Sequence, residues 1–320
     1  MSNSQNIFAE LRKEIGTVVV GQDYLLERLF VALLCKGHVL LEGVPGLAKT
    51  RILTALTTCI DAKMSRIQFT PDLLPSDLVG TEVYKPQSGE FTIRKGPVFT
   101  NLLLADEINR SPAKVQSALL QAMQERQVTI GEITFDLPEP FMVLATQNPI
   151  EQEGTYPLPE AQVDRFLMKI KVGYPTFDEE LNILKMVADN SESEKAPSKL
   201  RKILSITDLQ VLRNDLQSIH IDPKIDHYIV SIIQASRTPD KFGLKDMIEW
   251  GASPRASIAL KQCARALAFI RGKTFVTPDD VKEVSKDVLR HRIIPSYEAE
   301  VRGVNSDEVV GILFKNITIP

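Results

Sequence analysis

Cysteine, tryptophan and glycine are scarce in this chain of 320 residues, which contains three cysteines, one tryptophan and 16 glycines. Cys35, Cys59 and Cys263 lie far apart, and no pair has the spacing of metal ligands. A disulfide scaffold and a collagen-like fibre are therefore excluded. We expect three buried free thiols in a protein of the reducing cytoplasm.

Long apolar runs and an excess of one charge are also missing. No run approaches the roughly 18–20 apolar residues of a membrane span, and the polar N-terminus does not resemble a secretory signal. Lys and Arg number 38 against 41 Asp and Glu, so bulk charge gives no argument for nucleic acid or anionic membrane. What is present is an ordinary soluble composition, 43% hydrophobic and 25% charged, in a chain long enough for two domains.

The first half of the chain alternates short apolar runs with amphipathic stretches, which predicts a mostly parallel, doubly wound α/β sheet. The expected strands are 38–42, 64–70, 102–106, 141–146 and 166–172. Ser111 and Pro112 are expected to be the N-cap and first residue of a helix that ends near Gln127. Two inserted hairpins are expected, one formed by 90–94 and 98–100 around Gly96-Pro97, the other by 128–130 and 133–135 around Gly131-Glu132.

The pattern changes after Tyr174-Pro175, because almost every later segment has helical periodicity. The expected helices are 178–188, 208–218, 224–235, 254–271 and 278–290, with the polar stretch 189–199 as a loop. We therefore predict an α/β nucleotide-binding domain over 1–175 and a helical domain over 176–320.

The segment after the first strand carries the pattern G-x-x-x-x-G-K-[ST], except that Ala48 replaces the glycine before Lys49. In such a loop backbone N–H groups surround phosphates, the lysine neutralises the β- and γ-phosphates, and the hydroxyl of Thr50 is offered to Mg²⁺. A glycine-proline turn with a solvent-exposed lysine is the alternative. The expected binding residues are Gly43, Val44, Pro45, Gly46, Leu47, Ala48, Lys49, Thr50 and Arg51.

Acidic residues end the apolar strand 102–106. Because a buried parallel strand delivers its last side chains to the carboxyl edge of the sheet, Asp106 is expected to hold Mg²⁺ through water and Glu107 to polarise the attacking water. An apolar run ending in Asp-Glu is common by itself. Its place downstream of the phosphate loop is what indicates an ATPase.

Three further polar residues are candidates for the same reaction. Asn148 follows the strand 141–146 and could orient the water, although a turn before Pro149 would also explain it. Arg165, just before the last strand, could serve a neighbouring subunit or form a surface ion pair. Arg255 starts a helix, where the dipole disfavours a cation, so it is either functional or simply solvent-exposed.

With these residues the chain resembles the MoxR-type AAA+ ATPases over nearly its whole length, and the run from Leu158 to Phe166 is quite specific. The fold implied is a P-loop NTPase core with a C-terminal all-helical lid. The resemblance gives Asn148 the role of nucleotide sensor, Arg165 that of arginine finger and Arg255 that of second sensor. The segment expected to contact adenine is Val20, Gly21 and Gln22.

The resemblance further implies a ring of six subunits that uses ATP and Mg²⁺ for chaperone-like maturation or activation of partner complexes. Partners of such proteins often carry a von Willebrand factor A domain. Four alternatives stay open: a GTPase, a nucleic-acid motor, a metal-chelatase-type subunit and a non-catalytic scaffold. The missing Asn-Lys-x-Asp run disfavours guanine, the slightly acidic balance disfavours nucleic acid, and the intact Lys49, Asp106 and Glu107 disfavour a scaffold.

Overall fold

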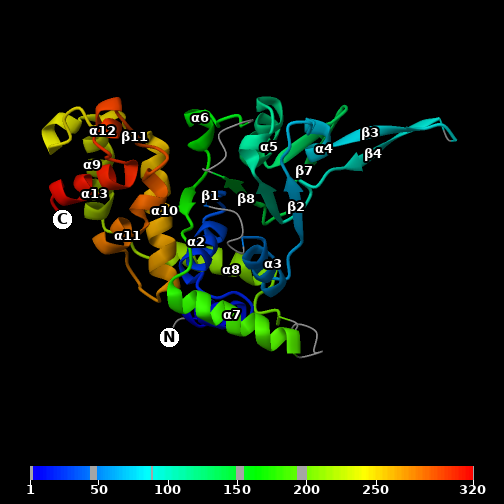
Figure 1. Cartoon of the computed structure of the whole chain (residues 1–320), viewed down its shortest axis with the longest axis horizontal. Helices are drawn as coiled ribbons and strands as arrows, with labels where there is room; N and C mark the ends of the chain where they lie inside the picture. Colours follow the sequence, from blue (N-terminus) through cyan, green and yellow to red (C-terminus); the bar gives the residue numbers. More distant parts are fainter. Residues whose placement is uncertain (1–2, 44–48, 88, 149–154, 193–199, 320) are drawn as a thin grey trace.

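Five parallel strands form the centre of the computed structural model, which describes residues 3–43, 49–87, 89–148, 155–192 and 200–319 (Figure 1). The strand order is β2-β5-β8-β1-β9, and all neighbours are parallel. The strands are β2 (Met64–Gln68), β5 (Leu102–Asp106), β8 (Met142–Gln147), β1 (Val39–Glu42) and β9 (Met168–Lys171). This order, with crossovers between all strands, confirms the predicted doubly wound sheet.

The apolar strands are nearly continuous because both faces of the sheet are buried. Val39 and Leu41 belong to the core shared with α1 (Asn3–Gly16), α2 (Asp23–Leu34) and α3 (Lys49–Cys59). Leu40, which points the other way, packs in the core beside α5 (Ala113–Glu125) and α4 (Pro75–Val79). Apart from the partly exposed edge strand β2, the strands β1, β5 and β8 are accessible only at their ends, so polar side chains at these ends are the ones that can meet a ligand.

Two details of the α/β part differ from expectation. Helix α5 begins at Ala113, so Pro112 is the N-cap, and the Ser111 hydroxyl instead donates to the carbonyl of Ile108 at 3.3 Å. The first insert pairs β3 (Gly80–Lys85) with β4 (Glu90–Lys95). The expected turn at Gly96-Pro97 is therefore wrong: Gly96 closes the base of the hairpin, where its N–H donates to the carbonyl of Val79.

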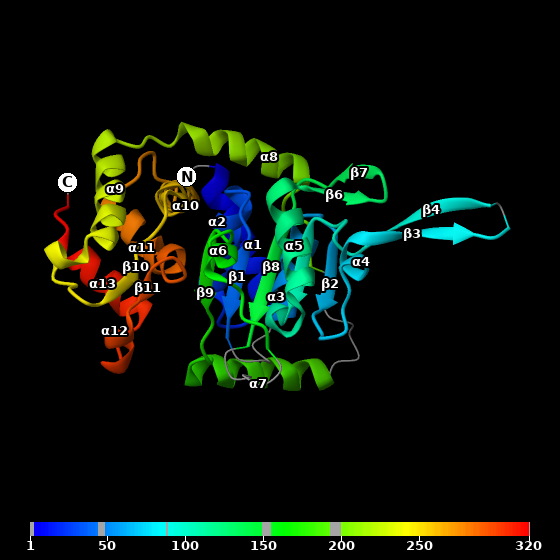
Figure 2. The same ribbon diagram turned by 90° about the horizontal axis from the view of Figure 1, so that it is seen from above.

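The second insert is the predicted hairpin, formed by β6 (Gln127–Ile130) and β7 (Ile133–Asp136). Gly131 has a φ of +61°, which the tight turn requires. Both hairpins project on the side of the molecule that holds β2 and α5, away from the C-terminal helices (Figure 2). They are therefore accessible to other molecules.

The chain after β9 is almost entirely helical, as predicted. Its helices lie at both ends of the strands and beside β9. Helix α7 (Phe177–Glu192) crosses the carboxyl edge of the strands, and α8 (Ile206–Asp215) lies at the opposite edge (Figure 2). Residues 189–192, expected in a loop, belong to α7, and 193–199 lie outside the described residues. The division at residue 175 stays a prediction.

The remaining helices pack beside β9. They are α9 (Pro223–Arg237), α10 (Pro254–Ile270), α11 (Pro278–Leu289), α12 (Tyr297–Val301) and α13 (Ser306–Asn316), with 3₁₀ turns at Ile108–Arg110, Leu216–Ser218 and Pro239–Phe242. A two-stranded pair, β10 (Ile248–Trp250) and β11 (Ile294–Pro295), was not predicted because each strand is very short. Among the described helices, none is long and apolar enough to cross a membrane.

Candidate functional site

The phosphate-loop residues that the structure describes are Gly43, at the end of β1, and Lys49 to Arg51, which open α3. The Lys49 ammonium donates to the carbonyl of Gly43 at 2.6 Å, so the lysine lies against the carboxyl end of β1. Burial lowers the pKa of Lys49, and the charges of Asp106 and Glu107 oppose that shift. Val44, Pro45, Gly46, Leu47 and Ala48 lie outside the described residues.

Asp106 ends β5 with both carboxylate oxygens engaged. The Thr146 hydroxyl donates to Oδ1 at 2.7 Å, and the Arg66 guanidinium donates to Oδ2 at 2.6 Å. Each carboxylate oxygen can accept more than one hydrogen bond. The side chain is therefore oriented by its partners while still able to accept bonds from a bound water.

Glu107 follows in a left-handed conformation, with a φ of 56°. Its N–H donates to the Thr146 hydroxyl at 2.8 Å, and Oε2 accepts from Gln68 at 2.7 Å and Arg110 at 3.0 Å. A non-glycine residue held in this region costs of order 1–3 kcal/mol and is found preferentially at functional sites. The strain turns the Glu107 carboxylate away from the strand direction and fixes it beside Asp106.

Asn148 follows β8, the strand that lies between β5 and β1. It is buried, with 8% of its surface exposed. Because β8 is flanked by the strands that carry Asp106 and Gly43, Asn148 lies at the same edge of the sheet as these residues.

The segment Val20-Gly21-Gln22 precedes α2, with Gln22 as its N-cap. Gly21 has a φ of +72°, and a Cβ there would lie only 2.6 Å from Cδ of Glu179 in α7. A larger residue at position 21 would have to displace the end of the Glu179 side chain, and the positive φ would strain its backbone. The structure thus brings this segment together with the helix that crosses the carboxyl edge of the strands.

Arg165 and Arg255 lie together at the other edge of the sheet, because Arg165 precedes β9 whereas Gly43 follows the parallel strand β1. Arg255 donates to Asp164 Oδ2 at 3.3 Å. Within the described part of the chain, the Arg165 side chain has no hydrogen bond or ion pair, and it is exposed. Strand β1 has four residues, which separates its two ends by about 13 Å at about 3.3 Å per residue.

These two arginines line a cavity of about 310 Å³. Its charged lining residues are Lys36, Arg126, Asp164, Arg165, Arg255 and Arg292. Five cations against one carboxylate make this cavity attractive to an anion such as phosphate. The structure therefore divides the predicted site residues into two groups at opposite edges of one sheet.

Sequence reasoning missed the side chains that hold the two acids. Arg66 and Gln68 alternate along β2 and so point to one face, where β2 pairs with β5 in the register Gln68 to Asp106. The alternating polar residues in the strand 64–68 were the available indication. They could be assigned only once β2 was known to lie beside β5.

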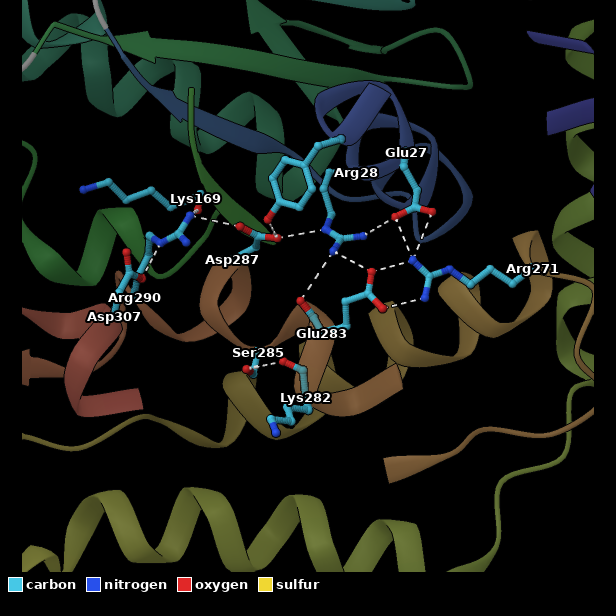
Figure 3. Close-up of polar contacts among 11 residues, drawn as sticks. Glu27, Arg28, Lys169, Arg271, Lys282, Glu283, Ser285, Asp287, Arg290 and Asp307 are labelled. Atoms are coloured by element: carbon cyan, nitrogen blue, oxygen red, sulfur yellow. Dashed lines mark hydrogen bonds and ion pairs between the residues drawn. The ribbon is translucent and has the colours of Figure 1, made fainter. Parts of the chain in front are cut away.

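A buried ion network joins α2 to α11 next to the adenine-segment candidate (Figure 3). The fully buried guanidinium of Arg28 donates to Asp287 at 2.8 Å, and the Tyr24 hydroxyl donates to the same carboxylate at 2.5 Å. Burial alone would lower the pKa of Arg28, but the Asp287 carboxylate outweighs it and raises that pKa. These contacts therefore fix α11 against the helix that follows Val20–Gln22.

The chemistry of the carboxyl edge fits Mg²⁺ bound together with a nucleotide. Mg²⁺ takes oxygen ligands and commonly uses one or two carboxylates besides phosphate and water. The Thr50 hydroxyl, in the first turn of α3, and the Asp106 carboxylate are of this kind. In the part of the chain that the structure describes, no three His, Cys, Asp or Glu side chains gather as a metal site of their own.

Comparison with known proteins gives matches over both parts of the chain. Residues 38–168 match the model of the ATPase family associated with various cellular activities (AAA), and residues 244–311 match the AAA lid domain. Chaperone MoxR1 of Mycobacterium tuberculosis is 48% identical over 310 residues, which are 96% of this chain and 81% of that protein.

A crystal structure of a protein from Cytophaga hutchinsonii is 48% identical, with a TM-score of 0.92 over 99% of this chain and 96% of the other. A magnesium-chelatase subunit, ChlI-1 of Arabidopsis thaliana, is more distant: 26% identical over 60% of this chain and 43% of that protein. The likeness to the chelatase subunit is therefore partial, whereas the likeness to MoxR1 spans both the sheet and the helices.

Proposed function

The chain belongs to the MoxR family of AAA ATPases, a family of chaperones, and from this membership we propose that it hydrolyses ATP at sites shared between neighbouring copies in a ring. Membership implies nucleotide binding and ATP hydrolysis. One observation carries the shared site: Arg165 and Arg255 lie at the sheet edge opposite Lys49, Asp106 and Glu107.

In this proposal the carboxyl edge binds the nucleotide. Lys49 neutralises the phosphates, Gly21 and its neighbours hold the adenine, and Glu107 accepts a proton from the attacking water while Asn148 orients that water. Thr50 and Asp106 would hold Mg²⁺. When bound, the positive charge of Mg²⁺ would offset the negative charge of the β- and γ-phosphates. Gln68 and Arg110 keep the Glu107 carboxylate in place.

The opposite edge of the sheet in the next copy, where the parallel strands begin (the amino edge), supplies the cations. Arg165 has no ion-pair partner among the described residues, so its charge is available to a phosphate of the neighbouring subunit. Among the described residues, Arg255 is held only by a 3.3 Å contact with Asp164, and it would join Arg165. Charge developing on the transferred phosphoryl group would thus be met by two arginines.

The ring is proposed to be a hexamer that acts on client protein complexes in the cytoplasm, with a partner that carries a von Willebrand factor A domain. The family resemblance supports both. The β3–β4 hairpin offers a surface for such contacts, because Tyr84 and Phe91 pair at 5.2 Å between ring centres and are exposed to solvent. At the base of this hairpin, Lys95 lies over the rings of Phe99 and Phe135 at 4.7 and 4.5 Å, so an aromatic contact already accounts for its position.

A mixing experiment tests the shared site. Glu107→Gln should lower turnover by about 10²–10⁴-fold and Arg165→Ala by about 10³–10⁵-fold. In a 1:1 mixture, about a quarter of the interfaces of a closed ring combine an intact Glu107 with an intact Arg165. The mixture should therefore regain up to about a quarter of wild-type turnover.

The matched control is a mixture of Glu107→Gln with the double variant Glu107→Gln/Arg165→Ala, which contains no complete interface and should stay inactive. Sizing in the presence of ATP confirms that all variants assemble. If both single variants assemble and their mixture has no more activity than either alone, Arg165 does not act across an interface.

A further inference from the structure

One face of helix α7 is directed at the rest of the protein, and two residues identify it. Glu179 lies against Gly21, since a Cβ at position 21 would come within 2.6 Å of Glu179 Cδ. Met186 lies seven residues further along, on the same face of the helix, and like Glu179 it is partly buried. Glu179 and Met186 therefore mark the inner face of α7.

The opposite face of α7 carries a row of large apolar side chains. Phe177, Leu181 and Leu184 are four and three residues apart, so they form one stripe along the helix. Phe177 and Leu184 each precede an inner residue by two positions, which at about 100° per residue places them roughly 160° around the helix. The stripe therefore points away from the protein.

Exposure confirms the direction of this stripe. The exposed fractions of Phe177, Leu181 and Leu184 are 81%, 40% and 64%. Within 177–186, the part of α7 whose side chains the structure describes, no side chain is buried. A surface helix ordinarily turns its apolar stripe to the core and its charged residues to water. The reversed arrangement in α7 is typical of a surface that another molecule covers.

The position of α7 indicates which molecule that is. The helix crosses the carboxyl edge of the strands (Figure 2), where Lys49, Asp106 and Glu107 lie. In the proposed function, on which this inference rests, a neighbouring copy brings Arg165 and Arg255 to that edge. Its amino edge must then approach alongside α7, so the stripe lies where a second copy of this chain is expected.

The amino edge has an apolar residue suited to such a contact. Ile258 in α10 is 58% exposed and lines the same cavity as Arg165 and Arg255. It follows Arg255 by three residues, so the two side chains lie on one face of α10. The amino edge therefore presents an exposed isoleucine beside two exposed arginines.

Charge also makes the two surfaces complementary. Asp178 and Glu180 are exposed on either side of the α7 stripe, whereas Arg165 and Arg255 are exposed beside Ile258. An apolar centre with opposite charges around it is a favourable composition for an interface. Two α7 stripes facing each other would instead bring like charges together. The charges therefore favour the head-to-tail contact from which closed rings are built.

We propose that the stripe Phe177, Leu181 and Leu184 docks on the surface around Ile258 of the next copy in the ring. This contact positions the amino edge of that copy against the nucleotide of the first copy. The stripe takes no part in the chemistry. A chain with a damaged stripe should therefore still hydrolyse ATP once a high protein concentration drives assembly.

Leu184→Asp tests this docking surface in the full-length protein. The protein concentration that gives half-maximal ATP turnover per chain should rise roughly 10–100-fold, the equivalent of one leucine side chain no longer buried. Turnover at saturating protein concentration should match wild type. Fluorescent-nucleotide titration of dilute single chains should give an unchanged affinity, which shows that the variant is folded.

The matched control is Val301→Asp. Val301 ends α12 and is 69% exposed, on the outer side of the C-terminal helices (Figure 2). The same change from an exposed apolar residue to aspartate should leave the half-maximal concentration as in wild type. An equal shift in both variants would mean that added negative charge, and not the α7 stripe, weakens assembly.

A cross-link identifies the surface that covers the stripe. Leu184→Cys mixed with Ile258→Cys and treated with a short bismaleimide in the presence of ATP should give peptides linked between positions 184 and 258 of different chains, detected by mass spectrometry. Leu184→Cys mixed with Val301→Cys should give no such link to position 301.

The outcomes separate this contact from the proposed function. Wild-type protein that hydrolyses ATP as single chains would refute the ring and this contact with it. If wild type assembles and Leu184→Asp assembles equally well, or if assembled chains give no link between 184 and 258, only the docking surface is refuted. A loss of turnover that high protein concentration does not restore would also refute it, because Leu184 would then act on the nucleotide site.

Discussion

The two edges of the central sheet differ in what their acidic and basic residues do. At the carboxyl edge, Asp106 and Glu107 are held by Arg66, Gln68 and Thr146, which contact them from β2 and β8. At the amino edge, Asp164 is engaged by Arg292, Ser253 and Arg255, while Arg165 and Arg255 are exposed. One edge therefore presents carboxylates, and the other presents arginines, to whatever binds.

In the proposed mechanism both edges are needed for one reaction, and this difference is the reason. Parallel strands place loops that follow them at one end and loops that precede them at the other. A residue before β9 cannot approach a ligand held after β1 in the same chain. Two copies stacked edge to edge bring the halves together, which makes assembly a requirement for catalysis in the proposed mechanism.

Substitution of Asp164, at the amino edge, should lower stability, whereas substitution of Glu107, at the carboxyl edge, should lower turnover. Asp164 accepts from the buried Arg292 at 2.8 Å and also binds Ser253 and Arg255. Burial lowers the pKa of Arg292, and the Asp164 carboxylate opposes that shift. Asp164→Ala would leave a buried cation without its carboxylate and should lower the free energy of unfolding by about 3–5 kcal/mol, measured by urea denaturation.

Asp164→Asn, which keeps an oxygen acceptor, should cost less than Asp164→Ala. Glu107→Gln is the control at the other edge, since it should abolish turnover while changing the unfolding free energy by no more than about 0.5–1 kcal/mol. An equal loss of stability in Asp164→Ala and Glu107→Gln would contradict the prediction that Asp164 stabilises the fold whereas Glu107 takes part in the reaction.

The strands and the phosphate-loop position could be predicted because each depends on local sequence. Apolar runs such as 102–106 identify buried strands, and the lysine after a glycine-containing loop has a fixed place at the start of a helix. The wrong hairpin turn at Gly96-Pro97 shows the limit of this reasoning. Gly and Pro mark a break in the chain, but the partner of β4 is β3, upstream, and only the pairing shows that.

Contacts between distant segments could not be predicted at all. The sequence does not show that Asp164 binds Arg292, or that Arg28 binds Asp287, because each pair is separated by more than a hundred residues and is joined only by the packing of the lid region. The same holds for Arg255. Its possible use was visible in the sequence, but the edge on which it lies was not.

The amino edge should also be the acid-sensitive one. His38, just before β1, accepts from the Val143 N–H at Nδ1, and Nε2 faces the Met123 carbonyl, both at 3.0 Å. Burial lowers the pKa of His38 from 6.5 to about 4. Between these values the unfolded chain binds a proton that the folded chain does not. Stability should therefore fall as the pH drops from about 6.5 to about 4, by on the order of 3 kcal/mol.

His291, which lies near the carbonyl of Phe166, should add to this dependence because burial also lowers its pKa. Urea denaturation at several pH values measures the slope. His38→Gln should reduce that slope by up to one proton. Identical slopes in the wild-type protein and this variant would show that His38 is not held neutral in the fold.

The smallest expected difference concerns nucleotide affinity in dilute protein, where sizing shows single chains. Lys49 lies at the carboxyl edge, so Lys49→Ala should weaken ATP binding by roughly 10–100-fold, the value of one lost charged hydrogen bond. Arg255→Ala should leave the affinity of the single chain within about twofold of wild type, because Arg255 lies at the opposite edge. Fluorescent-nucleotide titration measures both. A comparable loss in Arg255→Ala would place that arginine at its own chain's nucleotide and would remove the division between the two edges from which the shared site was inferred.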